Sequence, residues 1–305
     1  MIIKWVVEIS SKNNLKENRK HGTSLFPFCV YLNHNQRENK DYITSHHWHN
    51  ELEFILVKEG NCRVQVETDS YNIKTNQALF INSGEIHAIY SSKGTHLFHP
   101  IMFNINFLSN NLEDDCQLKY LDPVIKNKYK LKKVIKNKSN AEKKIINLLF
   151  QIVNFYVDKP FGYELMIKGL LFQMFFHYFT NNYFKKINHR SSVKINHIKK
   201  IIKFIHNNYD QKIDLDKMAG KLNLSKYYFS HIFKEIIGQT PIEYLNKYRI
   251  NKAAHLLLNS DKKILDISLL TGFNNLSYFI KTFKKFKNMT PSEFREKNEV
   301  EDYFL

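Results

Sequence analysis

Two histidines, a glutamate and a later histidine give the first hundred residues a set of side chains that could bind a metal ion or a polar ligand. The set reads His47-x-His49-x3-Glu53, followed further on by Ser83-Gly84-x2-His87. On one extended strand, residues 47, 49 and 53 would share a face, because side chains alternate with a period of two. Imidazole and carboxylate groups together suit manganese, iron, zinc or nickel. The pattern predicts a site, and its occupant stays open at this point.

A second set of residues recurs at a spacing of fifty near the C-terminus. Residues 228–243 and 278–293 share seven identities in sixteen aligned positions without a gap. The shared residues are Tyr228-Phe229, Phe233-Lys234, Thr240-Pro241 and Glu243, repeated as Tyr278-Phe279, Phe283-Lys284, Thr290-Pro291 and Glu293. A repeat of this period indicates one supersecondary unit used twice. Two helices joined by a tight turn in a basic region are typical of a helix-turn-helix.

A helix that contacts DNA buries an apolar residue at every third or fourth position and leaves the others outside. In 225–236 we expect Tyr228 or Phe229 to face inward with Ile232, Phe233 and Ile236, and in 276–286 we expect Phe279, Phe283 and Phe286 to be buried. The residues left outside are Lys226, Tyr227, Ser230, His231 and Lys234 in the first helix, and Leu276, Ser277, Ile280, Lys281 and Lys284 in the second. Three of the lysines, Lys226, Lys234 and Lys284, are expected to contact DNA phosphates.

The predicted secondary structure changes along the chain from strands in the first part to helices further on. Short apolar runs at 53–60, 61–67, 78–84 and 99–108 predict strands of a small barrel or sandwich. Residues 113–138 are weakly patterned and are expected to form a loop with short helices. Two apolar helical patterns between 140 and 180, separated by Asp158-Lys-Pro160, predict a helical hairpin. Its apolar faces leave two alternatives open, which are a dimer interface and packing onto its own barrel.

Beyond the polar segment Lys185 to Ser192 the pattern is helical throughout. Ser225 is expected to cap the helix that follows it, since a serine hydroxyl accepts from the first-turn amides. The helix opened by Pro241 runs through Leu258 in this prediction, about 27 Å at ~1.5 Å per residue. It could hold the two units rigidly enough to enter successive major grooves, ~34 Å apart.

Charge, cysteine content and the lengths of the apolar runs limit the class of protein to which the chain can belong. The 305 residues carry a formal net charge of +17, and residues 193–297 hold 20 lysines and arginines against 9 acidic residues. That balance favours a polyanion partner, although a lysine-rich genome with merely solvated charges is the alternative. Cys29, Cys62 and Cys116 are too far apart for a disulfide framework. No signal peptide or unbroken membrane span is evident, so we expect a cytoplasmic protein without a membrane partner.

Residues 193–297 resemble the DNA-binding domain of AraC/XylS-type transcriptional regulators. The resemblance rests on Leu215-x-x-Met-Ala219, Leu224-Ser225-x-x-Tyr-Phe229-x-x-x-Phe-Lys234, Gly238-Gln-Thr-Pro-Ile-Glu-Tyr-Leu245, Tyr248-Arg249-Ile250, Gly272-Phe273 and Met289-Thr-Pro-Ser-Glu-Phe-Arg295. It implies that the base-facing positions are Tyr227, Ser230 and His231, then Leu276, Ser277, Ile280 and Lys281. The chain departs from the family at His231, where arginine is frequent, and at Leu276 and Ile280, where a polar residue is frequent. Leucine and isoleucine could still contact thymine methyl groups.

The histidine motif resembles the paired motifs of cupins, whose enzymes bind a metal through two histidines, a glutamate and a later histidine. The sensor domains of AraC-type regulators carry a similar pattern at this place, usually without a metal, and bind a small effector there. The resemblance therefore implies that His47, His49, Glu53 and His87 line an effector pocket, with a sugar or related metabolite as effector. We expect no catalytic residue, no cofactor and no metal.

The sequence thus predicts an α+β multidomain protein. Its parts are a cupin-like effector-sensing barrel (1–138), a helical hairpin that is a candidate for dimerisation (139–185), a linker (186–192), an all-α double helix-turn-helix domain (193–297) and a tail (298–305). The predicted function is a DNA-binding transcription regulator, in particular an activator, that acts as a homodimer on double-stranded promoter DNA and contacts RNA polymerase. The alternative is a metal-dependent cupin enzyme, an isomerase or dioxygenase, with a basic helical tail. That alternative leaves the helix-turn-helix repeat unexplained.

Overall fold

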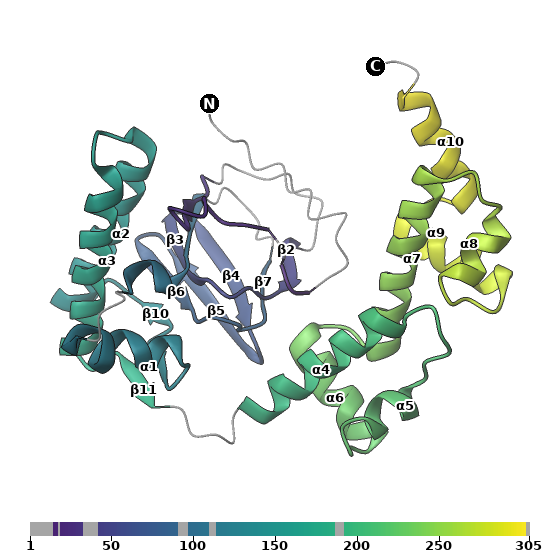
Figure 1. Ribbon diagram of the computed structural model, residues 1–305, viewed down its shortest axis with the longest axis horizontal. Coiled ribbons are helices and arrows are strands. Elements are labelled where there is room, and N and C mark those ends of the chain that lie inside the picture. Colours follow the sequence, from purple (N-terminus) through teal and green to yellow (C-terminus); the bar gives the residue numbers. More distant parts are fainter. Residues whose placement is uncertain are drawn as a thin grey trace. The chain divides into compact units, whose positions relative to one another are not determined.

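The computed structural model describes residues 15–17, 19–32, 42–90, 97–109, 114–186 and 192–302. The chain divides into two compact units, one within Lys16–Ser191 and one within Ser192–Leu305. Strands dominate the first unit and helices alone make up the described part of the second (Figure 1). The predicted α+β class, with a β-rich cupin-like part followed by a helical part, is confirmed. Most of the predicted linker, residues 187–191, lies outside the described residues, as do 303–305 of the predicted tail.

Two antiparallel sheets form the frame of the first unit. One has five strands in the order β1-β8-β3-β6-β10, and the other has four in the order β2-β7-β4-β5. Their strands are β1 (Phe28–Val30), β2 (Tyr42–His47), β3 (Leu52–Glu59), β4 (Asn61–Val66), β5 (Asp69–Lys74), β6 (Gln77–Ile81), β7 (His87–Tyr90), β8 (Leu97–Phe103) and β10 (Val134–Ile135). A small third sheet pairs β9 (Tyr129–Leu131) with β11 (Phe184–Lys186).

Strand β3 is buried on both faces along its first six residues. Ile55 and Val57 pack into the core between the two sheets, which also contains Val64 and Ile89. The alternate residues, such as Phe54, pack into a second core on the other face of the five-stranded sheet. This explains why residues 54–57 form a continuous apolar run instead of alternating, since a strand covered on both sides has no solvent face.

The second core is closed by a hairpin of α2 (Asn140–Asp158) and α3 (Tyr163–Thr180). Ser139 and Glu142 form a capping box at the start of α2, which satisfies amides that the first turn leaves without partners. The hairpin therefore packs onto its own sheet, which was one of the two alternatives. Its outer face still exposes apolar side chains, including Leu165 and Phe176.

Residues 114–138 are more regular than expected. They contain the helical turn η2 (Gln117–Leu121), the short helix α1 (Asp122–Ile125), β9 and β10, and the turn η1 (Ile105–Leu108) precedes them. Strand β10 extends the five-stranded sheet by pairing Val134 with Leu79 and Ile135 with Ala78. A two-residue strand is too short to show a period, so local pattern could not predict it.

Seven helices form the described part of the second unit. They are α4 (Ser192–Asn208), α5 (Leu215–Gly220), α6 (Lys226–Ile237), α7 (Pro241–Asn259), α8 (Ile264–Leu270), α9 (Leu276–Lys287) and α10 (Pro291–Asp302). Helices α5 and α6 pack together, as do α8 and α9, and α7 contacts members of both pairs. Figure 1 shows α7 running between the two pairs. Among the described residues, no helix has the length and apolar character needed to cross a membrane.

Candidate ligand site and nucleic-acid interface

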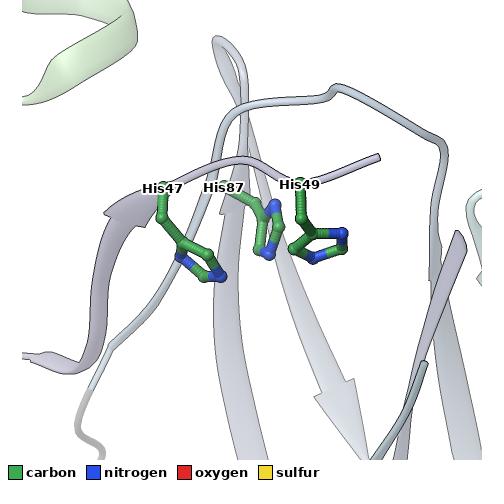
Figure 2. A group of neighbouring side chains, drawn as sticks. All are labelled: His47, His49 and His87. Atoms are coloured by element: carbon green, nitrogen blue, oxygen red, sulfur yellow. The ribbon is translucent and has the colours of Figure 1, made fainter. Parts of the chain in front are cut away.

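Three histidines meet where β2 ends and β7 begins (Figure 2). His47, the last residue of β2, is paired with His87, the first residue of β7. His49 follows two residues later and faces the same point. The potential ligand atoms of the three rings all lie within 4.8 Å of one another. The structure therefore brings together the three histidines that the sequence motif singled out.

Glu53 joins them from a different strand. The expectation that residues 47, 49 and 53 share one strand is wrong, because the chain bends at residues 50 and 51 and starts β3 at Leu52. β2 belongs to the four-stranded sheet and β3 to the five-stranded sheet. Alternation along a single strand cannot reveal a turn between two sheets. The site consequently draws its residues from both sheets.

Backbone carbonyl groups hold all three rings in the same way. Nδ1 of His47 lies 2.9 Å from the carbonyl oxygen of Ser45, and Nδ1 of His87 lies 2.9 Å from that of Glu85. Nδ1 of His49 lies 3.1 Å from the carbonyl oxygen of Glu51. A carbonyl oxygen only accepts, so each Nδ1 carries a hydrogen and donates it. In a neutral ring, Nε2 is then the atom with a free lone pair, which is the arrangement of metal-binding histidines.

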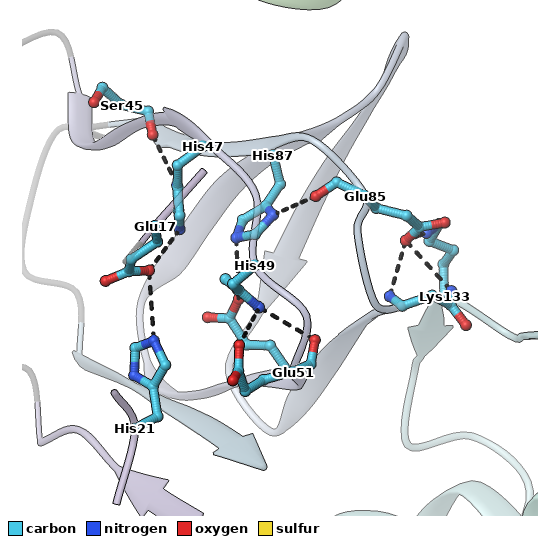
Figure 3. A network of polar contacts seen from close by, with 11 residues as sticks. Glu17, His21, Ser45, His47, His49, Glu51, Glu85, His87 and Lys133 are labelled. Atoms are coloured by element: carbon cyan, nitrogen blue, oxygen red, sulfur yellow. Dashed lines mark hydrogen bonds and ion pairs between the residues drawn. The ribbon is translucent and has the colours of Figure 1, made fainter. Parts of the chain in front are cut away.

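Two carboxylates face these Nε2 atoms (Figure 3). Oε2 of Glu53 lies 3.2 Å from Nε2 of His49 and 3.1 Å from Nε2 of His87. Oε2 of Glu17 lies 3.6 Å from Nε2 of both His47 and His21. The amide of Glu17 donates to the carbonyl of Trp48, which fixes residue 17 beside the motif.

The pKa values of these groups follow from burial and from their contacts. Burial raises the pKa of the Glu53 carboxyl, but hydrogen bonds from His49 and His87 outweigh it and hold this pKa well below its usual range. Burial lowers the pKa of His47 to about 3, and the neighbouring histidines act in the same direction. Burial also acts to lower the pKa of His87, but its hydrogen bond with Glu53 raises it overall. Glu53 is therefore ionised and His47 neutral at pH 7.

A buried ion pair supports the turn that presents His87. The Glu85 carboxylate contacts the ammonium group of Lys133, and its Oε1 lies 3.1 Å from Nζ of Lys130. Its Oε2 accepts from the amide of Asn82 at 2.9 Å. Because the carbonyl of Glu85 holds the His87 ring, this ion pair positions the ring indirectly.

Sequence reasoning missed Glu17, His21 and Glu85. Glu85 lies inside the Gly84 to His87 segment, so a search for charged neighbours of the motif could have found it. Glu17 and His21 lie in a stretch without a recognisable period, and no signal in the sequence connects them to residues 47–87.

The donor set fits a divalent transition metal. Three imidazole nitrogens and a carboxylate are the ligands that zinc, nickel and iron accept in proteins, and open positions remain for water. His47, His49 and His87 would hold such an ion together with Glu53. The same groups could instead hydrogen-bond a polar ligand. In either case the bound partner would face a carboxylate and three rings fixed by backbone groups.

The second unit carries the candidate nucleic-acid interface. In α6, Phe229, Ile232, Phe233 and Ile236 are buried, whereas Tyr228 is 45% exposed. This resolves the choice between Tyr228 and Phe229. The Ser225 hydroxyl accepts from the amide of Tyr228, so the predicted cap is present. Tyr227 is 82% exposed, His231 and Lys234 are exposed, and Ser230 is half-buried.

Helix α9 repeats this arrangement with two differences. Phe279 and Phe283 are fully buried, and Leu276, Ser277, Lys281 and Lys284 are exposed. Ile280 and Phe286, however, are both partly buried against the core around Phe283. The prediction placed Ile280 outside and Phe286 inside, whereas both side chains lie at the border of the buried face. Ile280 can offer a base only part of its side chain.

The three lysines predicted to contact phosphates differ in whether they already form an ion pair within the protein. Lys234 and Lys284 are exposed. Nζ of Lys226 lies 3.5 Å from Oδ1 of Asp216, an exposed ion pair that contributes little energy. A phosphate group could displace the aspartate from Lys226 at small cost.

Helix α7 joins the two helix pairs through specific contacts. The Arg249 guanidinium donates to the carbonyl oxygens of Tyr209 and Gln211, each at 2.7 Å. Gly272, in the turn between α8 and α9, has a φ of +83°, and a Cβ there would lie 2.5 Å from the Tyr209 carbonyl oxygen. The side-chain amide of Asn246 donates through Nδ2 to the Tyr278 hydroxyl at 2.8 Å. These contacts connect the loop before α5, helix α7 and the second helix pair.

Comparisons with known proteins agree with this geometry. A family described as "AraC-like ligand binding domain" matches residues 32–128, and one described as "Helix-turn-helix domain" matches residues 218–297. The HTH-type transcriptional regulator YdeC of Bacillus subtilis, itself described as uncharacterized, is 27% identical over 287 residues, covering 93% of this chain and 97% of YdeC. The "Probable transcription factor PqrA" of Proteus vulgaris is 40% identical over 93 residues, covering 30% of this chain and 76% of PqrA.

Among solved structures, the C-terminal domain of the response regulator yesN from Fusobacterium nucleatum is 35% identical. The match covers 33% of this chain and 98% of that domain, with a TM-score of 0.32.

Proposed function

Because the chain belongs to the AraC family of transcription regulators, we propose that it controls transcription by placing α6 and α9 in successive major grooves of promoter DNA. It is a DNA-binding regulator with a ligand-binding domain, and the enzyme alternative is set aside. We keep the predicted boundaries of the barrel, hairpin, linker, DNA-binding domain and tail as part of this proposal.

The observation that carries the proposal is the matched pair of anchored helices. Each is fixed by two fully buried phenylalanines, Phe229 and Phe233 in α6 and Phe279 and Phe283 in α9. Each leaves its opposite face to solvent, where Tyr227, His231 and Lys281 are exposed. Helix α7 has 19 residues, about 28 Å at ~1.5 Å per residue, which is compatible with a separation near one turn of DNA.

Replacing His231 with alanine is expected to relax sequence preference, whereas replacing Lys234 is expected to weaken binding to all sequences. A lost base contact costs about 1–3 kcal/mol at one position of the site. A lost phosphate contact instead flattens the salt dependence by about one unit of slope. Lys281→Ala should alter preference less than His231→Ala, because its neighbours Leu276 and Ile280 are apolar. The measurement is a binding-site selection with each variant at fixed salt. An unchanged preference for His231→Ala beside a shifted one for Lys234→Ala would mean that α6 contacts DNA with a different face.

The proposal places the effector at the histidine cluster of the first unit. Support comes from the concentration of buried polar groups at this point, where His49, Glu53 and His87 are each at most 3% exposed. Buried polar groups that are not required for packing mark binding sites more often than chance. The sequence resemblance implied a sugar or related metabolite as the effector.

The outer face of α3 supports a homodimer. Leu165, Phe172 and Phe176 are 77%, 38% and 61% exposed, and their spacing of seven and four puts them on one stripe of the helix. Gly169 lies on the same stripe, with open space where its Cβ would be. A groove of about 410 Å³ continues the stripe, lined by Cys116, Tyr120, Leu121, Phe172, Phe175, Phe176, Phe179 and Thr180. An apolar helix face of this kind is typical of an interface.

Phe176→Asp is expected to weaken self-association about a hundredfold, because a charge in an apolar interface costs on the order of 3 kcal/mol. Sedimentation of the full chain over a range of concentrations measures the effect. Phe161→Asp is the control, since Phe161 is fully exposed and precedes α3, which begins at Tyr163. Equal behaviour of the two variants, or a monomeric wild type, would contradict the assignment.

Activation through RNA polymerase is the direction of control that we propose. It rests on the family resemblance, and in vitro transcription from a bound promoter tests it. Transcript levels should rise with the protein present and stay at the basal level with a variant that does not bind DNA.

A further inference from the structure

The histidine cluster has two properties that a site for an organic effector does not require. Its three rings are all fixed through Nδ1, so that Nε2 of each points at its neighbours. Its carboxylates then approach those same Nε2 atoms. In neutral rings this arrangement sets oxygen lone pairs against nitrogen lone pairs. A proton on Nε2, as in the hydrogen bonds that His49 and His87 make with Glu53, or a bound cation would remove the repulsion.

The charges of the surrounding groups also favour a bound cation. Glu53 is 3% exposed and Glu17 approaches the cluster from the N-terminal segment. No lysine or arginine contact to either carboxylate is present among the ion pairs of the described residues, in contrast to Glu85, which contacts Lys130 and Lys133. A buried carboxylate requires a paired charge or a bound cation. Within the part of the chain that the structure describes, the only side-chain cations available to these carboxylates are the histidines of the cluster itself.

The spacing of the rings limits what can lie between them. The ring centroids of His47 and His87 are 4.2 Å apart, and those of His49 and His87 are 5.0 Å apart. A sugar or aromatic ring cannot enter between side chains this close. Nitrogens bound at ~2.0–2.1 Å to one tetrahedral zinc ion lie about 3.4 Å apart. The potential ligand atoms of the three rings lie within 4.8 Å of one another, so side-chain movements would bring them to that spacing.

We propose that the effector of this regulator is a divalent transition-metal ion of the zinc, nickel or cobalt class, bound by Nε2 of His47, His49 and His87 with Glu53. Glu17, which lies outside the motif, supplies a second negative charge beside His47. The inference rests on the proposed function and replaces its sugar-like effector with an ion. It also departs from the metal-free pocket expected from the sequence, since the ion here is a regulatory ligand and no reaction is assigned to it.

The test measures binding of Zn²⁺, Ni²⁺ and Co²⁺ to the tag-free full-length protein by calorimetry, with the visible absorption of Co²⁺ reporting on its ligands. One ion per chain is expected. Glu53→Gln, close in shape to the native residue, should lower affinity at least tenfold, and Glu17→Gln should lower it less. Glu51→Gln is the matched control, because Glu51 lies beside His49 but on the Nδ1 side, at 3.8 Å, and should leave affinity unchanged. Thermal unfolding without metal verifies that each variant folds.

The regulatory part is tested with a DNA duplex that the protein itself selects. Metal at saturating concentration should change the affinity of the wild type for this duplex at least fivefold, and Glu53→Gln should respond only at higher metal concentration. Absence of stoichiometric binding, or binding that is indifferent to Glu53→Gln and to His47→Gln, overturns the site. Binding of the ion without any change in DNA affinity overturns its role as effector. In each of these cases DNA binding by the apoprotein would leave the proposed function standing, whereas a protein that binds no DNA in any state would overturn that function.

Discussion

Replacing Phe283 with alanine is expected to lower the free energy of unfolding of the second unit by about 3–5 kcal/mol, the usual cost of removing a buried phenylalanine. The side chain is fully buried in the core formed with Ile250, Leu257 and Phe279. Its ring centroid lies 5.8 Å from that of Phe279 and 5.5 Å from that of Phe294. The substitution would leave a cavity directly beneath α9. A unit of this size has a stability of about 5–15 kcal/mol, so DNA binding at physiological temperature should also fall.

Urea unfolding of the full chain, followed by signals from each unit, measures the effect. The transition of the second unit should move to lower urea while that of the first unit stays in place. Phe286→Ala on the same helix is the control, because Phe286 is only partly buried and should cost markedly less. Equal costs for the two substitutions would show that Phe283 is not the anchor of α9.

Arg249→Met is expected to destabilise the second unit by roughly 2–6 kcal/mol, since the carbonyl groups of Tyr209 and Gln211 would each lose a charged donor at ~1–3 kcal/mol apiece. Arg249 is 8% exposed, so water replaces these hydrogen bonds poorly. The substitution should also weaken binding to a complete DNA site more than binding to half of it, because Arg249 helps to fix the two helix pairs relative to α7.

Lys252→Met is the matched control, because it also removes a positive charge from helix α7. Its Nζ lies 5.6 Å from the ring centroid of Tyr248 and makes no ion pair with any described residue, so a small change is expected. Competition assays with full and half sites, at one salt concentration, separate the two variants. A loss of affinity by Arg249→Met that is the same for both kinds of site would argue against its connecting role.

The helical unit could be predicted closely from sequence because its helices bury one face each, and burial of one face repeats every three to four residues. The spacing of Phe229, Ile232, Phe233 and Ile236 follows that period. Periodicity gave no answer where two aromatic residues are adjacent, as at Tyr228 and Phe229, since either could fill the position. It also misplaced Ile280 and Phe286, which lie at the border of the buried face.

The histidine site was predictable only in part. Motif spacing identified His47, His49, Glu53 and His87, but the turn between β2 and β3 was not visible in it. Glu17 reaches the site through the hydrogen bond of its amide to Trp48, a contact across about thirty residues that no local pattern encodes. Pairings of that kind depend on the complete fold, which is also why β10 was missed.

Strand β3 gives the ligand-binding unit a mechanical property. It carries Glu53 near one end, and its following residues alternate between the core shared by the sheets and the core shared with α2 and α3. Protein interiors are packed as densely as organic crystals, so a buried strand cannot shift alone. A displacement of Glu53 by even a fraction of an ångström would be resisted by both cores together. The site is consequently rigid. A ligand of the wrong size would have to displace Glu53, and the packing of both cores would oppose that displacement in addition to the side chains that contact the ligand.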